Sequence, residues 1–143
     1  MVAPNLTSNL LTETWNNGAG TLDSNCSYHY QVHNIEQVKF DSIGLRFSVH
    51  RDHSKWAVTS GSNKVACVGD INRQEEQFRR AGGTVCFARN ENVWYQYSQL
   101  VEQIEPCKIS MSYKINRKNS KKFRRNQMKK FKMADSNEVI ILL

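Results

Sequence analysis

The sequence predicts an α/β fold, with a mixed β-sheet and helices packed on it. Short segments rich in β-branched and aromatic residues recur between turns marked by Gly, Asn and Ser, which is typical of strands. One later segment carries an apolar stripe at helical spacing. The 143 residues are 39% hydrophobic and 23% charged, a globular composition that excludes wholesale disorder and accommodates one domain with a core.

The polar N-terminal stretch, residues 1–27, contains one apolar patch at Leu10, Leu11 and Trp15. We expect it to form either a short strand or an irregular lead-in to the sheet. In residues 28–40, four side chains share even positions, as they do on one face of a strand: Tyr30, Val32, Val38 and Phe40. The first regular strand is therefore predicted within this segment.

A turn is expected at residues 41–44, where the chain reads Asp-Ser-Ile-Gly. Residues 45–49 then alternate with period two, and residues 56–59 have a similar β-favouring composition. The sequence predicts that these two segments form a hairpin or an adjacent pair of strands.

Two brief apolar segments, residues 65–69 and 84–88, are expected to be buried strands. The predicted helix covers residues 91–104, with Asn90 as its N-cap and Pro106 just beyond its last turn. Its apolar stripe consists of Val93, Tyr97, Leu100, Val101 and Ile104.

The cysteines form an even set without any Cys-x-x-Cys pair. Zinc ligands come in close pairs, so the wide spacing favours two disulfides over a zinc site or free thiols. The four residues are Cys26, Cys67, Cys86 and Cys107.

Two sequons, at Asn5 and Asn25, predict glycosylation and point to a secretory history. The N-terminus shows no charged segment followed by an apolar one, so no signal peptide is visible. We therefore expect the chain to lack its natural beginning.

The net charge of +7 is unevenly distributed. Residues 1–107 hold nine Lys and Arg against eleven Asp and Glu, whereas residues 108–143 hold eleven against two. A block with so many like charges repels itself, so residues 115–143 are predicted to form a basic, disordered tail.

The longest apolar run, residues 139–143, is far shorter than the ~20 residues of a membrane-spanning helix, and no membrane association is expected.

His53 and Lys55 are the first candidates for chemistry. In an extended segment, residues at i and i+2 project from the same face, which would place an imidazole beside an ammonium group. The ammonium group can bind a phosphodiester oxygen, while the imidazole can attack phosphorus or transfer a proton. His-x-Lys is common by chance, so surface placement without function is the competing interpretation.

His29 and His33 lack partners at ligand spacing, so no metal site is expected there.

Three stretches of sequence give this pair a context. They are Asp52-His53-Ser54-Lys55-Trp56-Ala57-Val58, Cys67-Val68-Gly69-Asp70-Ile71-Asn72-Arg73-Gln74 and Gly82-Gly83-Thr84-Val85-Cys86. In order and spacing they resemble the C-terminal half of deoxyribonuclease II, a family of lysosomal acid endonucleases that includes plancitoxin-like toxins. The resemblance spans about residues 10–114, so residues 1–114 are interpreted as one half-domain.

This family is similar to the phospholipase D superfamily, in which two His-x-Lys motifs, one from each half of a pseudo-dimer, meet at one active site. The resemblance implies metal-independent hydrolysis of DNA without a cofactor, through a phosphohistidine, leaving 3′-phosphate ends. It implies that His53 and Lys55 are one catalytic pair and that Asn72 hydrogen-bonds the phosphate. It also implies disulfides between Cys67 and Cys86 and between Cys26 and Cys107, and a lysosomal or secreted location.

The chain contains one His-x-Lys motif, because His29, His33 and His50 are followed at +2 by other residues. The second motif must then come from a missing N-terminal half or from a second copy in a homodimer. The alternatives are a catalytically inactive secreted paralogue that binds nucleic acid or a host partner, and an incomplete gene product.

Overall fold

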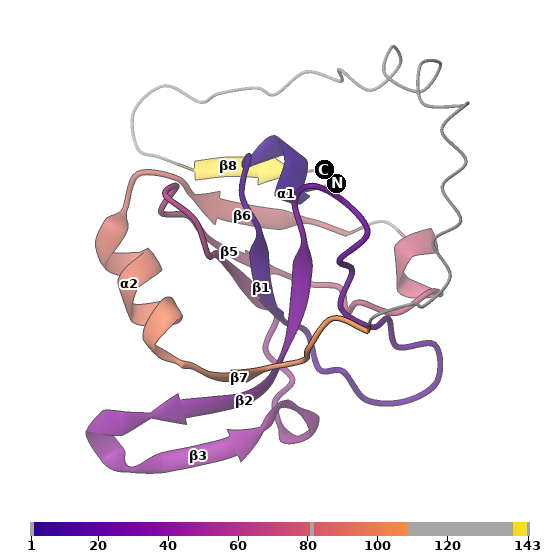
Figure 1. Cartoon of the computed structure of the whole chain (residues 1–143), viewed down its shortest axis with the longest axis horizontal. Helices are drawn as coiled ribbons and strands as arrows, with labels where there is room; N and C mark the ends of the chain where they lie inside the picture. The colour runs from indigo at the N-terminus through magenta and orange to yellow at the C-terminus, as the bar shows by residue number, and fades with distance from the viewer. Residues whose placement is uncertain (1, 81, 109–138, 143) are drawn as a thin grey trace.

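The computed structural model describes residues 2–80, 82–108 and 139–142 and confirms an α/β fold with a mixed sheet (Figure 1). The strand order is β3-β2-β1-β4-β5-β6-β8, and β7 also pairs with β2. The strands are β1 (Leu10–Glu13), β2 (Val32–Phe40), β3 (Leu45–Ser48), β4 (Trp56–Thr59), β5 (Ala66–Gly69), β6 (Thr84–Phe87), β7 (Val101–Ile104) and β8 (Val139–Leu142). The helices are α1 (Val2–Asn5) and α2 (Glu91–Gln99), with short 3-10 turns η1 (Asp41–Ile43), η2 (Val49–Arg51) and η3 (Gln77–Arg79).

The first strand lies in the middle of the sheet. β1 pairs in parallel with β2 and antiparallel with β4, where Glu13 stands opposite Trp56. The remaining pairings along the sheet are antiparallel, from β4 through β5 and β6 to β8. The patch at Leu10 and Leu11, expected as a strand or a lead-in, is therefore a central strand.

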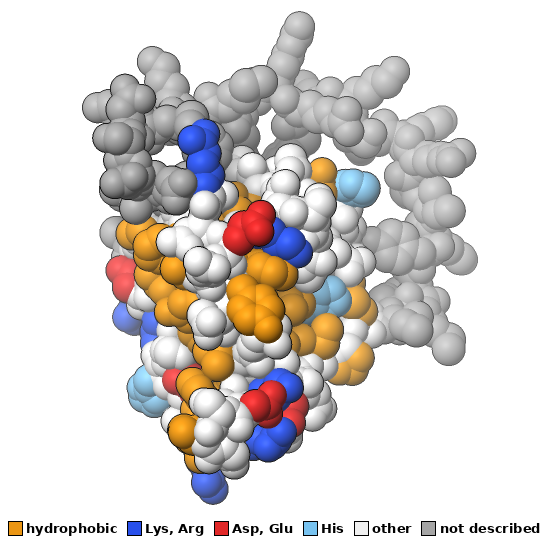
Figure 2. All heavy atoms as spheres, turned by 90° about the vertical axis from the view of Figure 1, so that its left-hand side faces the viewer, with side chains coloured by type: hydrophobic (Ala, Val, Ile, Leu, Met, Phe, Trp, Pro, Cys, Tyr) orange, Lys and Arg blue, Asp and Glu red, His pale blue; other side chains and the backbone are white. Residues whose placement is uncertain are grey.

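Alternation along the strands divides the core into two clusters on opposite faces of the sheet. On one face, Ala3 and Leu6 around α1 pack with Leu10 and the Cys67–Cys86 disulfide. On the other, α2 covers a cluster centred on Ile35, Val38, Val49, Trp56, Val58 and Ala66. Figure 2 views the molecule from the α2 side, where acidic and basic side chains lie intermixed rather than forming a patch of one sign.

The predicted helix is correct at its start and too long at its end. The Asn90 side chain accepts a hydrogen bond from the backbone N–H of Val93, so Asn90 is the N-cap. The helix ends at Gln99, and the last two residues of its predicted stripe, Val101 and Ile104, lie in β7. They pair with Val38 and Ile35 of β2, because that strand has a free edge beyond its pairing with β1.

The predicted pairing of residues 45–49 with residues 56–59 is wrong. β3 forms a hairpin with β2 instead, closed by η1 and by Gly44, whose φ of 64° a glycine adopts without strain. β4 crosses to the middle of the sheet, between β1 and β5. Trp56 and Val58 are apolar side chains that are buried there against α2.

Both predicted disulfides are confirmed. Cys67 and Cys86 stand directly opposite each other on β5 and β6, with Cα atoms 4.0 Å apart. Cys26 and Cys107 join the loop before β2 to the segment after β7, 81 residues later, with Cα atoms 5.9 Å apart.

Most of the predicted basic tail, residues 115–138, lies outside the described residues, as do residues 109–114 before it. Residues 139–142 form β8 on β6, a strand that the sequence analysis did not assign. Within the described ranges, no helix has the length and apolar character needed to cross a bilayer.

Candidate active site

The sequence motifs meet at one end of the sheet, where β1 and β5 finish and β4 begins. His53 and Lys55 lie in residues 52–55, just before β4, rather than inside a strand. The Lys55 Nζ donates a hydrogen bond to the His53 carbonyl oxygen at 2.5 Å. The Lys55 carbonyl in turn accepts from the Gly69 N–H at 2.9 Å, which holds the end of β5 beside this segment.

Lys55 and Asn72 line one pocket of about 320 Å³. Most of its wall is apolar, with Leu10, Tyr30, Ile71 and Phe78 among the lining side chains. Asn72 is only 4% exposed, and its backbone N–H donates to Gln77 Oε1 at 2.6 Å. Its Oδ1 has no hydrogen-bond partner among the described residues. This oxygen can accept a hydrogen bond from a donor in the pocket, whereas contact with a phosphate oxygen would need the amide NH₂ of Asn72.

His53 does not line this pocket. Its side chain is exposed, and its imidazole packs against the indole ring of Trp15, with ring centroids 3.9 Å apart and planes tilted by 41°. The structure thus brings Lys55 and Asn72 to one pocket and places His53 against the turn that follows β1.

Glu13, the last residue of β1, is fully buried beside this segment. Its Oε1 accepts from the Trp15 backbone N–H at 3.0 Å, and its Oε2 accepts from the Ser54 hydroxyl at 3.3 Å. Burial raises the pKa of Glu13 from its ordinary 4.5 to about 7; Asp52 adds to the rise, whereas the two hydrogen bonds and Lys55 oppose it. The carboxyl is therefore mostly protonated in mildly acidic solution.

Sequence reasoning missed Glu13 and Trp15 as site residues. Glu13 follows Leu10, Leu11 and Thr12 in β1, and nothing in the residue order shows that its side chain is buried. Its position depends on the register that sets it opposite Trp56, the residue that follows the His53–Lys55 segment. The signals in the sequence are a charged residue at the end of this segment and the place of Glu13-Thr14-Trp15 within the stretch that resembles the family.

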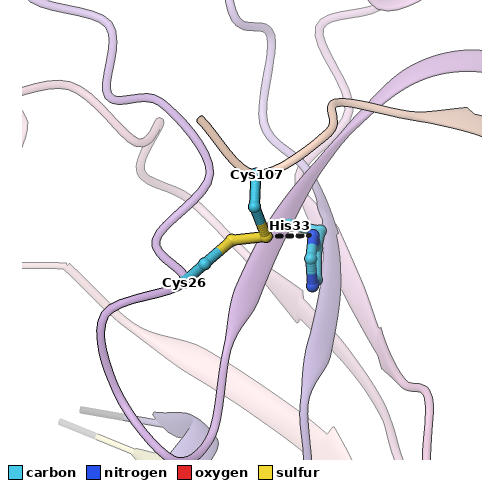
Figure 3. A group of neighbouring side chains, drawn as sticks. All are labelled: Cys26, His33 and Cys107. Atoms are coloured by element: carbon cyan, nitrogen blue, oxygen red, sulfur yellow. Dashed lines mark hydrogen bonds between the residues drawn. A yellow bond between two sulfur atoms is a disulfide. The ribbon is translucent and has the colours of Figure 1, made fainter. Parts of the chain in front are cut away.

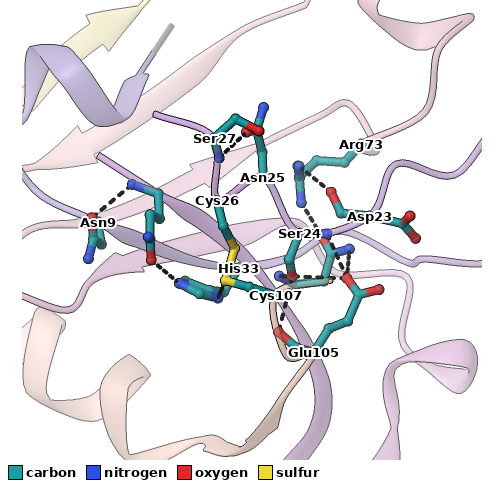
Figure 4. Close-up of a disulfide and its surroundings, with 12 residues drawn as sticks. Asn9, Asp23, Ser24, Asn25, Cys26, Ser27, His33, Arg73, Glu105 and Cys107 are labelled. Atoms are coloured by element: carbon teal, nitrogen blue, oxygen red, sulfur yellow. Dashed lines mark hydrogen bonds between the residues drawn. A yellow bond between two sulfur atoms is a disulfide. The ribbon is translucent and has the colours of Figure 1, made fainter. Parts of the chain in front are cut away.

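Arg73, the neighbour of Asn72, connects this segment to β2 and to the loop before β2, and Figure 4 shows it beside Asp23 and Glu105. Its guanidinium donates to Asn34 Oδ1 and, at 3.1 Å, to the Asp23 carbonyl. Asn34 also donates to Glu105 Oε2 at 2.8 Å, and that carboxylate accepts from Ser24 as well. Burial lowers the pKa of Arg73, while Glu105 and Asp23 oppose this effect. The segment that carries Asn72 is thus fixed by a partly buried polar network.

Cys26, His33 and Cys107 are the described group whose ligand atoms cluster as a metal site would require, all within 4.8 Å of one another (Figure 3). The His33 Nδ1 lies 3.9 Å from the Cys107 Sγ, and the Nε2 lies 3.0 Å from Gln31 Oε1. The two sulfurs are bonded to each other, so neither offers the thiolate that a metal ion needs. These residues therefore do not fit a metal in this state.

The two sequon asparagines, Asn5 and Asn25, are both exposed. Asn25 lies next to Cys26, in the loop that the Cys26–Cys107 disulfide holds. Both positions are accessible to a modifying enzyme on the folded chain.

Comparison with known proteins finds one matching family model, Deoxyribonuclease II, over residues 1–107. Cell-death-related nuclease 7 of Caenorhabditis elegans is 40% identical over 108 residues, covering 74% of this chain and 29% of the relative. Plancitoxin-1 of Acanthaster planci is 43% identical over 107 residues, with the same coverage of 74% and 29%. Deoxyribonuclease-2-alpha of Mus musculus is 41% identical over 107 residues, covering 74% and 30%. The chain thus spans less than a third of the length of these relatives, and no solved structure matches it.

Proposed function

The chain belongs to the deoxyribonuclease II family, and we propose that it is a half-domain of an acid endonuclease that hydrolyses DNA phosphodiester bonds without a metal ion. The observation that carries the proposal is the convergence of the His53–Lys55 segment and Asn72 at one end of the sheet. Lys55 and Asn72 supply a cation and an amide to the same pocket. An ammonium group and an amide donor are suited to hold phosphate oxygens.

In this mechanism, two histidines divide the work. The imidazole nitrogen of one attacks phosphorus and forms the N–P bond of a phosphohistidine, while the P–O5′ bond breaks and the other histidine protonates the leaving 5′ oxygen. Water then attacks the phosphohistidine, gives up its proton to the second histidine, and releases a 3′-phosphate end. Lys55 neutralises charge on the non-bridging oxygens, and Asn72 donates a hydrogen bond to them.

One chain holds one His-x-Lys pair, so we propose that the second pair comes from another half of a longer protein or from a second copy of this chain. The lengths of the relatives support the first source, because the matched segment is 29–30% of each of them. Either source would complete a phospholipase D-like pseudo-dimer around the pocket end of the sheet.

The test is cleavage of supercoiled plasmid at about pH 5 in EDTA, at an oligomeric state measured by light scattering. His53→Ala should lower the rate by about 100-fold or more, because it removes either the nucleophile or the general acid of the reaction. His29→Ala is the matched control, since His29 is an exposed histidine whose ring packs on Tyr30 rather than on the His53–Lys55 segment. Equal rates for wild type and His53→Ala would overturn the proposal, as would the absence of cleavage by a folded dimer for the homodimeric form.

The second candidate is a catalytically inactive paralogue that binds nucleic acid or a host partner. The single His-x-Lys motif favours this candidate, because one histidine cannot supply both the nucleophile and the general acid. Retarded migration of DNA without cleavage in the same assay would support this function. An incomplete gene product is distinguished by sequencing the transcript upstream of Met1.

We propose a lysosomal or secreted location. Two disulfides support it, because such bonds persist in oxidising compartments. Glycosylation at Asn5 and Asn25 belongs to the same proposal and is tested by the mass lost on treatment with an amidase that removes N-linked glycans.

A further inference from the structure

We propose that Glu13 and Trp15 are positioning residues for His53: the Glu13 carboxyl ties the turn after β1 to the segment before β4, and the Trp15 indole fixes the imidazole. The inference rests on the proposed catalytic role of His53. It concerns two residues outside the His53–Lys55 motif and outside residues 69–73, which contain Asn72.

Glu13 connects two segments that are far apart in the sequence. One oxygen accepts from the Trp15 N–H, and the other accepts from the hydroxyl of Ser54, the residue between His53 and Lys55. Because the carboxyl is fully buried, water does not compete for these hydrogen bonds. The carboxyl therefore fixes the distance between the turn and the candidate catalytic segment.

Trp15 adopts a backbone conformation that its side chain disfavours. Its φ is 45°, in the left-handed region that a bulky residue rarely occupies. Four contacts hold it there: the Glu13 carboxyl on its N–H, the Asn17 N–H on its carbonyl at 2.7 Å, the His50 carbonyl at 3.3 Å from its Nε1, and the His53 ring against its indole. Such strain persists where the surroundings over-determine it, and here it presents the indole to the imidazole.

The charged groups that face Glu13 make this arrangement sensitive to pH. They are Asp52 and Lys55, both from the segment before β4, together with the polar donors Trp15 N–H and Ser54 Oγ. Once Glu13 ionises, its buried charge is penalised by the loss of hydration and repelled by Asp52, and these effects outweigh the hydrogen bonds from Trp15 and Ser54 and the attraction of Lys55. We therefore expect His53 to be held best where Glu13 keeps its proton, below about pH 7.

The first experiment measures the His53 ring directly by NMR of the full-length chain, with the ring resonances assigned by comparison with His53→Ala. The indole lies close enough to shift these resonances by its ring current. Trp15→Leu should move them toward the values of a solvated histidine, and Trp15→Phe should restore part of the shift. Trp94→Leu is the control, because Trp94 lies on α2 and donates to the Thr59 carbonyl instead. Unchanged His53 resonances in Trp15→Leu would overturn the inference.

The second experiment separates positioning from binding. Trp15→Leu should lower kcat for DNA cleavage by about 10-fold or more with little change in KM, because a displaced imidazole loses its alignment with the reacting atoms while the substrate keeps its affinity. Glu13→Gln keeps a side chain of the same size whose oxygen can accept from the Trp15 N–H, so the variant should retain activity at about pH 5. Because glutamine does not ionise, the variant should lose less of its activity above pH 7 than the wild type does. Identical pH profiles for Glu13→Gln and wild type would remove Glu13 from the inference.

The two proposals fail in different ways. If the chain cleaves no DNA, the NMR shifts still test whether Glu13 and Trp15 hold His53. If His53→Ala abolishes cleavage while Trp15→Leu changes neither the shifts nor kcat, the function stands and the positioning role falls. Ser54→Ala removes one hydrogen bond without changing a core side chain, so it tests the link should Glu13→Gln fail to fold.

Discussion

At the scale of single residues, the buried carboxyl of Glu13 couples the stability of the fold to pH. Its pKa of about 7 in the folded chain exceeds the 4.5 that it has when exposed, because burial penalises the charged form. The folded chain therefore holds a proton that the unfolded chain releases between these two values. The resulting stabilisation is complete below pH 4.5 and is lost as pH rises to about 7.

We predict that Glu13→Gln flattens the dependence of unfolding free energy on pH. The wild-type chain should lose on the order of 2 kcal/mol between pH 4.5 and 7 through this residue, and the variant should not, because glutamine does not titrate. Urea unfolding at a series of pH values measures the difference. Glu91→Gln, on the exposed start of α2, should keep the wild-type slope. Parallel curves for wild type and Glu13→Gln would contradict the prediction.

The sequence nominated some residues of the candidate site and gave no indication of others. His53, Lys55 and Asn72 were predicted because short motifs carry them, and their roles stay predictions. Glu13 and Trp15 were missed because their roles depend on burial, on a positive φ and on the register between β1 and β4. Residue order determines none of these three properties directly, since each arises when distant segments meet.

At the scale of elements, local patterns predicted strands and the start of the helix, but pairing followed tertiary contacts. Residues 56–59 were predicted as a strand with the correct bounds, yet their neighbour is β1 rather than β3. Val101 continues a helical apolar stripe in the sequence, and the free edge of β2 recruits it into β7 instead. Short apolar segments fit both the helical and the strand periodicity, so the element that they pack against decides which structure forms.

The two disulfides should contribute unequally to stability. In the chain-entropy model, the Cys67–Cys86 bond, with a separation of 19 residues, contributes about 3 kcal/mol, and the Cys26–Cys107 bond, with a separation of 81, about 4.5 kcal/mol. We predict that Cys26→Ala with Cys107→Ala lowers the guanidinium midpoint more than Cys67→Ala with Cys86→Ala does. The reverse order would show that packing around Cys67 and Cys86, both nearly fully buried, outweighs loop closure.

At the scale of the whole molecule, the excess of positive charge and the candidate site residues lie in different parts of the sequence. The net charge of +7 comes from residues 108–143, whereas residues 1–107, which match the family, carry more acidic than basic residues. The proposed DNA substrate therefore depends on the residues at the pocket end of the sheet and on the family. The positive net charge alone would favour DNA only through attraction to its phosphates.

Mixing experiments can show whether two copies build one site. If each site needs His53 from both subunits, an equimolar mixture of wild type and His53→Ala should retain about one quarter of the wild-type activity after subunit exchange, because only wild-type pairs cleave. A mixture with His29→Ala should retain full activity. Retention of one half would mean that each chain acts independently, which excludes a shared site.

The position of β1 determines which shorter forms of this protein can exist. β1 joins β2, with its partners β3 and β7, to β4, with β5 and β6, and the pairings of the sheet provide no other hydrogen-bonded connection between these groups among the described strands. A proteolytic product or alternative transcript that begins after residue 13 would therefore not lose a strand from the margin. It would be left with two separate sheet fragments, each with a newly bare edge, and such edges favour aggregation over function.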